Sequence, residues 1–185
     1  MPSLSELQER LDKLVCSEGL DPDRGDCLDI AAAACLASRQ SGFEASVKYL
    51  ERFQDGCSVS VVHAVCYVGD EPFGSTRSSM NDLEEHLDFL EEDDAYSLRL
   101  AQECDDEDET EDLASRSYEI SEVSSQDLVD KGVSQVFAAF AEREKNNRSE
   151  PLLNVGRVNR YVSCLLGLPQ PKLKKSPAKS ASMGF

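Results

Sequence analysis

The amino-acid sequence predicts a mainly α-helical protein built from one small domain. Apolar residues recur at three- and four-residue steps in several segments, and this spacing places them on one face of a helix. A run of alanines between Cys27 and Arg39 adds a stretch that strongly favours helix. Of the 185 residues, 6% are aromatic and 30% are charged, so Leu, Val and Ala must supply most of the core. We therefore expect about five or six helices around one core.

The first helix is expected to begin after a capping box at Ser3–Glu6. In this box the Ser3 hydroxyl and the Glu6 carboxylate accept hydrogen bonds from backbone N–H groups that the start of a helix leaves free. Leucines then form one apolar stripe at helical spacing: Leu4, Leu7, Leu11 and Leu14. Gly19 and Pro22 end the helix, because Gly is costly inside a helix and Pro forces the residue before it toward extended geometry.

Three apolar segments follow the first helix. Cys27–Arg39 predicts a helix that is apolar on nearly all sides and so lies centrally in the core. Phe43–Gln54 predicts a third helix, because its apolar residues recur at helical steps and the breaker Asp55-Gly56 follows it. Cys57–Gly69 is rich in β-branched residues and fits either a buried helix or a strand, since periodicity alone does not separate the two.

The second half of the chain alternates between helical and polar segments. Residues 70–79 predict a loop, and residues 80–102 predict an exposed helix with a leucine stripe. Cys104–Ser125 is acidic and then rich in serine, so we expect it to be disordered. Helical periodicity then returns, and Pro151 suits the first position of the last helix. The expected domains are a helical region at 1–103, a disordered linker at 104–125, a helical hairpin at 126–168 that packs on the first region, and a basic disordered tail at 169–185.

The negative charge of the chain is concentrated in one segment. The formal net charge is -17 at pH 7, and residues 82–112 hold 16 Asp or Glu against one Arg, a balance of -15. Such a segment repels phosphate groups and anionic lipid, so direct binding to nucleic acid or to a membrane is disfavoured. It is either a solvated acidic linker or a surface that attracts basic proteins.

The cysteines indicate a reducing compartment. Seven are present at scattered positions with no C-x-x-C pair, which is typical of free thiols in a cytosolic or nuclear protein. No apolar run approaches the roughly 18 residues needed to span a bilayer, and Met1-Pro2-Ser3 opens no signal-peptide pattern. We expect a soluble protein of the nucleus and cytoplasm.

The basic tail contains two candidate signals. Four lysines lie close together and suit either a nuclear-import signal or a generic solubilising tail: Lys172, Lys174, Lys175 and Lys179. Ser176 lies in a Ser-Pro-x-Lys sequence of the kind that cyclin-dependent kinases favour. Phosphorylation of Ser176 would cancel part of the lysine charge.

No motif in the sequence points to catalysis. The G-x-S-x-G motif, a Gly-rich phosphate loop and the H-E-x-x-H motif are all missing. Cys57, His63 and Cys66 could be written as three zinc ligands, but their spacing matches no established zinc finger and a fourth ligand would be as distant as Cys35 or Cys104. We therefore expect ordinary core packing at these positions, with no metal, no cofactor and no enzymatic activity.

The segment Leu14–Leu20 has the form of a docking peptide. Leu14, Cys16, Glu18 and Leu20 fall at every second position, so in an extended chain they would all point to one face. This pattern resembles the L-x-C-x-E motif with which viral early proteins hold retinoblastoma-family pocket proteins. The papillomavirus transforming protein, the adenovirus early-region-one oncoprotein and the polyomavirus large T antigen carry it. The resemblance covers seven residues and implies a pocket protein as the partner.

Two functions follow from these patterns. The first is a non-enzymatic nuclear regulator, in the manner of a viral early protein, that occupies the groove of a pocket protein and relieves its repression of S-phase genes in the host cell. It requires the end of the first helix to fray, because the leucine stripe and the docking motif both need Leu14. The alternative is an acidic interaction protein, either a transcription coregulator or a chaperone of basic partners, that acts through residues 82–112.

Overall fold

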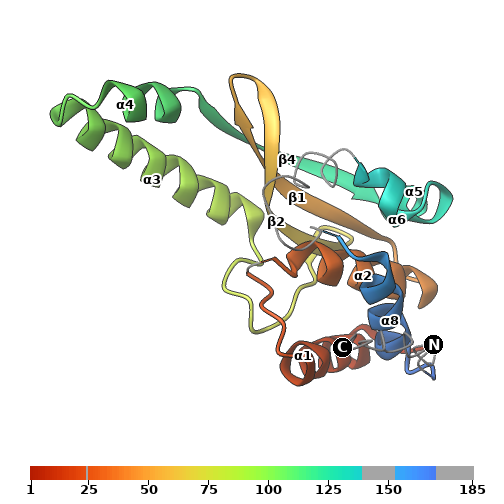
Figure 1. The fold of residues 1–185 in the computed structure, drawn as a ribbon. Coiled ribbons are helices and arrows are strands. Elements are labelled where there is room, and N and C mark those ends of the chain that lie inside the picture. Colours follow the sequence, from red (N-terminus) through yellow and green to blue (C-terminus); the bar gives the residue numbers. More distant parts are fainter. Residues whose placement is uncertain (24, 139–152, 170–185) are drawn as a thin grey trace, which may run out of the picture.

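The structure, a computed structural model, describes residues 1–23, 25–138 and 153–169. Within these residues seven helices surround a four-stranded antiparallel sheet (Figure 1). The helices are α1 Leu4–Glu18, α2 Cys27–Gln40, α3 Leu83–Glu103, α4 Glu107–Ala114, α5 Ser125–Asp130, α6 Val133–Val136 and α8 Val155–Leu166. The strands are β1 Ala45–Gln54, β2 Cys57–Val68, β3 Glu71–Pro72 and β4 Arg116–Ser124. The fold is therefore mixed α/β, and the prediction of a mainly α-helical protein is wrong.

The sheet has the strand order β3-β2-β1-β4. Its centre is the hairpin of β1 and β2, which a two-residue turn at Asp55-Gly56 connects. Both turn residues have positive φ, 52° at Asp55 and 73° at Gly56, the pattern of the type I′ turn that joins hairpin strands. The sequence predicts a helix end at this dipeptide, whereas the structure uses it to reverse a strand.

The segment Phe43–Gln54 is wrongly predicted to be a helix because both faces of the sheet are covered. Val47 and Tyr49 of β1 face the larger core. Leu50, the residue after Tyr49, faces a second core on the opposite side of the sheet. A strand that is buried on both faces loses the alternation of apolar and polar residues. The remaining spacing of Val47 and Leu50 then imitates a helix.

The segment Cys104–Ser125 is also ordered, in contrast to the disorder that its composition predicts. Residues Glu107–Ala114 form α4, and Arg116–Ser124 form β4, which pairs with β1 in an unbroken register from Ser46↔Ser124 to Gln54↔Arg116. Tyr118 and Ile120, two residues apart, pack under α3. This spacing of two is the sequence pattern of a strand, but the many charged residues around it make the pattern hard to recognise.

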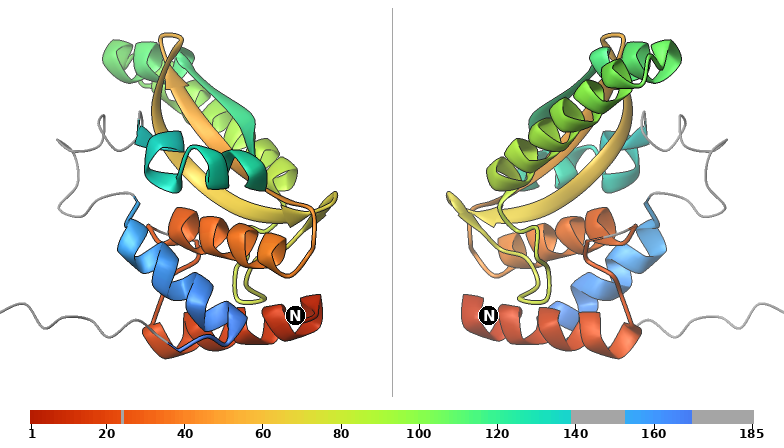
Figure 2. Two further views of the ribbon diagram at one scale, coloured as in Figure 1. Left: turned by 90° about the vertical axis from the view of Figure 1, so that its right-hand side faces the viewer. Right: turned by 90° about the vertical axis from the view of Figure 1, so that its left-hand side faces the viewer.

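The helices form layers on the two faces of the sheet (Figure 2). On one face lie α2, α5 and α6, with α8 and then α1 behind α2, and their buried side chains form the larger core. α2 is buried on nearly all sides, as its sequence predicts. On the other face the N-terminal half of α3 covers the sheet, and its C-terminal half projects beyond the body with α4 (Figure 1). None of the described helices is both long enough and apolar enough to cross a membrane.

An ion-pair network fixes α8 on α2. Arg157 of α8 lies 2.7 Å from the carboxylate of Asp29 through its Nε and 2.9 Å from that of Asp26 through its Nη1. The backbone N–H of Asn154, which begins α8, donates to Asp29 Oδ1 at 2.8 Å. Asp29 has no exposed surface. Burial raises the pKa of Asp29 to about 6, against the opposing effects of the Asn154 N–H and Arg157.

Candidate protein-interaction surface

The residues of the predicted docking motif lie at the end of a helix. α1 continues through Glu18, and Gly19 ends it in the left-handed conformation with φ 64°. Leu14 is 5% exposed within the larger core, as the leucine stripe requires, and Leu20 packs partly buried against the same core. Cys16 is exposed, and Glu18 forms a 2.8 Å ion pair with Arg160 of α8.

This helical geometry separates the side chains of the motif. Residues two apart on a helix point in nearly opposite directions, whereas on a strand they share a face. Cys16 therefore points away from the flank that Leu14 and Glu18 occupy. Binding in an extended groove would require the last turn of α1 to unfold, Leu14 to leave the core and Glu18 to leave Arg160.

The three candidate zinc ligands do not meet. Cys57 and Cys66 lie near opposite ends of β2, and the rise of about 3.3 Å per residue separates them by about 30 Å. His63 and Cys66 are buried, while Cys57 is exposed. Within residues 1–23, 25–138 and 153–169, no three His, Cys, Asp or Glu side chains form a group that could hold a metal ion.

The signals predicted in the basic tail lie outside the described residues. This holds for the four lysines Lys172, Lys174, Lys175 and Lys179 and for Ser176. The nuclear-import and phosphorylation signals therefore remain predictions from sequence.

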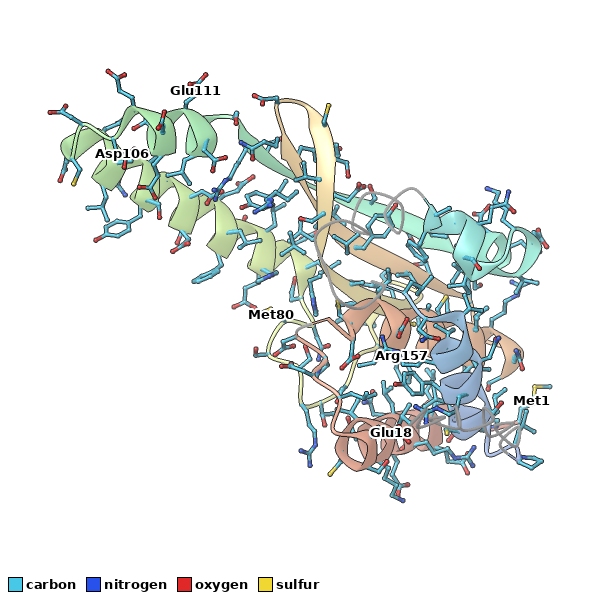
Figure 3. All side chains as sticks on the ribbon, viewed as in Figure 1. Met1, Glu18, Met80, Asp106, Glu111 and Arg157 are labelled. Carbon is cyan, nitrogen blue, oxygen red and sulfur yellow. The ribbon has the colours of Figure 1, made fainter. Side chains whose placement is uncertain are left out.

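The acidic segment folds into two antiparallel helices, α3 and α4, which we call the acidic helix pair (Leu83–Ala114). Of the 16 acidic residues at 82–112, Asp94 is half-buried and the others are exposed. Figure 3 shows Asp106 and Glu111 at the end of the pair that lies far from α1 and α8. The charge of residues 82–112 is thus displayed on an ordered, projecting surface, although the sequence predicts an exposed helix only as far as residue 102 and disorder from Cys104.

The start of α3 is fixed by a cap and by the sheet. Asp82 Oδ1 accepts hydrogen bonds from the backbone N–H groups of Glu84 and Glu85 at 3.0 and 3.2 Å, which satisfies donors that the helix start leaves free. Leu83 is fully buried, and Leu87 and Leu90 pack beside it against the second core. This leucine stripe agrees with the prediction from sequence.

Polar contacts hold the middle of α3 on β4. The hydroxyl of Tyr118 donates to Asp94 at 2.7 Å, and Arg116 Nη1 lies 3.3 Å from the same carboxylate. Arg116 also pairs with Asp112 of α4. Burial, together with the hydrogen bond to Asp94, raises the pKa of Tyr118 to about 12. Arg116 therefore links both acidic helices to the sheet and offsets part of their mutual repulsion.

An apolar stripe runs along an outer flank of α3. Phe89, Tyr96 and Leu100 are 61%, 57% and 43% exposed. They follow one another at steps of seven and four residues, so they share a flank that is roughly a third of a turn from the buried leucine stripe. Exposed large apolar side chains that line up in this way are typical of an interaction surface. We call these three residues the exposed stripe.

A pocket of about 240 Å³ lies at the N-terminal end of the exposed stripe. Its walls come from the loop before α3 and from the first turns of the helix: Ser79, Met80, Asp82, Glu85, His86 and Phe89. The rings of His86 and Phe89 are stacked, with 6.4 Å between centroids and 10° between planes. His63 also contacts His86, edge to face, with 5.9 Å between ring centroids. Partial burial lowers the pKa of His86, opposed by the charge of Asp23, which favours neutral imidazole at pH 7.

Comparisons with known proteins identify no relative of this chain. It matches no protein-family model, no curated protein and no solved structure.

Sequence reasoning identifies the acidic residues but misses the exposed stripe and the pocket. The spacing of Phe89, Tyr96 and Leu100 can be seen in the sequence. From sequence alone, however, these residues cannot be told apart from the buried leucines of the same helix. The contribution of Ser79 and Met80 to the pocket depends on how the loop folds against α3, which no local pattern encodes.

Proposed function

We propose that this protein is a non-enzymatic binding module for a basic protein segment, and that the acidic helix pair is its binding surface. The observation that supports this most strongly is that exposed carboxylates and the exposed stripe lie on the same ordered helix. A solvated linker has no need for an exposed Phe, Tyr and Leu on one flank of a helix. A docking surface for a basic partner uses both, since charge raises the rate of encounter and apolar anchors prolong the bound state.

The alternative partner, a retinoblastoma-family pocket protein bound through Leu14, Cys16, Glu18 and Leu20, ranks second. It requires the unfolding of the last turn of α1, whereas the acidic helix pair presents its groups without rearrangement. Exchange of Cys16 for Gly together with Glu18 for Lys tests it directly. Loss of pull-down of a retinoblastoma pocket domain would support the motif, and unchanged capture would exclude it.

The experiment for the acidic helix pair uses octa-arginine as a basic probe and measures its dissociation constant by fluorescence anisotropy. The test variant neutralises two exposed acids in each helix: Asp88→Asn, Glu92→Gln, Glu107→Gln and Glu111→Gln. The control variant neutralises four exposed acids away from the acidic helix pair: Glu9→Gln, Glu44→Gln, Glu119→Gln and Asp130→Asn. All eight side chains are exposed, and both variants gain the same charge.

We expect the test variant to bind octa-arginine at least about tenfold more weakly than the control variant, because nearby charges act more strongly than those beyond a Debye length. Affinity of the wild type should fall steeply between about 0.05 M and about 0.5 M NaCl. Equal weakening in both variants would show that net charge alone attracts the probe, and would overturn the assignment to the acidic helix pair.

A further inference from the structure

We infer that the pocket at the start of α3 receives an arginine side chain of the basic partner. This inference rests on the proposed function and specifies which residue of the partner anchors it. The pocket volume of about 240 Å³ lies below the roughly 300–1,000 Å³ of small-molecule sites. It suits one long side chain.

The charge of the pocket favours a cation. Glu85 is exposed, and Asp82 uses Oδ1 for its two capping bonds. Among the contacts of the described residues, neither the Glu85 carboxylate nor Asp82 Oδ2 has a hydrogen-bond or ion-pair partner. Two carboxylates with free acceptor oxygens are therefore available at the wall of one pocket. The planar guanidinium of arginine matches such acceptors with paired N–H donors, which a lysine ammonium does not.

The aromatic wall favours the same side chain. The ring of Phe89 is mostly exposed and lies parallel to that of His86. A guanidinium stacks flat on an aromatic face and gains a cation–π attraction there, while Met80 supplies an apolar contact for the methylene stem. A neutral His86 adds no charge that would repel the guanidinium.

The pocket is built before any partner arrives. Asp23 holds the loop that forms one wall, because it accepts hydrogen bonds from Ser79 N at 3.1 Å, from Ser79 Oγ at 2.9 Å and from Ser78 Oγ at 2.5 Å. The buried His63 packs edge to face against His86. Since the walls are fixed by groups outside the pocket, little conformational entropy is lost on binding.

The test compares octa-arginine with octa-lysine, which carry equal charge. We expect the wild type to prefer octa-arginine by about fivefold, the ratio that a cation–π contact of modest strength gives. Phe89→Ala and Glu85→Gln should each remove the preference. The controls Val129→Ala and Glu44→Gln, which change an exposed apolar side chain and an exposed acid outside the acidic helix pair and the pocket, should keep it.

The outcomes separate this inference from the proposed function. Binding of both peptides with equal affinity would overturn the arginine pocket and leave the acidic surface intact, whereas binding of neither would overturn the proposed function. The chain contains two histidines, so the ring signals of His86 give a second readout by nuclear magnetic resonance. They should shift with octa-arginine in the wild type and not in Phe89→Ala, and unshifted His86 signals in the bound wild type would place the arginine elsewhere.

Discussion

At the scale of single residues, the structure resolves the double use of Leu14 in favour of the helix. Its side chain is buried among leucines and the helices behind α2, and Cys16, two residues later, faces solvent. Leu14 should therefore contribute much more to the stability of the fold than Cys16, although the docking motif would use both side chains in the same way. This difference can be measured without any partner.

Leu14→Ala should lower the free energy of unfolding by about 2–5 kcal/mol, because it removes buried methyl groups and leaves a cavity. Cys16→Ala should change the free energy of unfolding by less than about 0.5 kcal/mol, because the thiol is exposed. Urea unfolding of both variants measures the two values. If Leu14→Ala proved as neutral as Cys16→Ala, the end of α1 would be open, and docking through the motif would become the better account.

The buried carboxyl of Asp29 predicts an unusual dependence of stability on pH. Its pKa is raised from 3.8 to about 6 in the folded protein, so the folded state holds the proton more tightly than the unfolded state. Stability from this group is therefore lost as pH rises from about 4 to about 6 and beyond, by about 3 kcal/mol in total. Burial lowers the pKa of His63 to about 4, and its contribution has the opposite sign.

The variant Asp29→Asn isolates the carboxyl from the histidine. The unfolding free energy of the wild type minus that of Asp29→Asn should fall between about pH 4 and about pH 7, because both proteins share His63 and only one can ionise Asp29. Urea unfolding at several pH values gives this difference. A difference that stays constant, or that rises with pH, would mean that Arg157 compensates the buried charge fully.

At the scale of secondary-structure elements, the sequence predicts helices α1, α2 and α3 because each has a strong local signal. These signals are the capping box before Leu4, the alanine run of α2 and the leucine stripe of α3. β1 and β4 are missed for two separate reasons. β1 is buried on both faces and so has no alternation, and β4 has the right alternation but is embedded in acidic and serine-rich sequence.

The candidate site is predictable only in part for a related reason. Charge at residues 82–112 can be counted from the sequence, but the pocket depends on the clamp between Asp23 and the loop before α3. These residues are more than 50 positions apart, at a separation of 55 for Asp23 and Ser78. No motif of local sequence reports such a contact.

Hydrogen exchange tests whether β4 is a strand. Its regular pairing with β1 predicts that amides along Arg116–Ser124 alternate between slow and fast exchange, because every second N–H on an edge strand bonds to its neighbour. Site-resolved exchange by nuclear magnetic resonance gives this pattern directly. Uniformly fast exchange along the segment would restore the prediction of a disordered linker.

At the scale of the whole molecule, the uneven charge sets a cost for folding. The net charge of -17 repels itself in the compact state, most strongly where α4 carries five acidic residues in eight positions. We expect the melting temperature to rise by a few degrees when NaCl increases from about 0.02 M to about 0.2 M, since salt screens this repulsion. A melting temperature that fell or stayed constant would show that attractive ion pairs such as those of Arg116 dominate instead.

The same repulsion explains why a basic partner fits this molecule. A cationic segment laid along the acidic helix pair would neutralise charge that the fold holds at a cost, while the exposed stripe would give it apolar contacts. The most direct measurement is nuclear magnetic resonance mapping of the ¹⁵N-labelled chain during titration with octa-arginine. We predict that the shifted amide signals cluster within the acidic helix pair and the adjoining residues Ser79–Asp82. Shifts that concentrate on other parts of the described surface, or signals that do not move at saturating probe, would contradict the account.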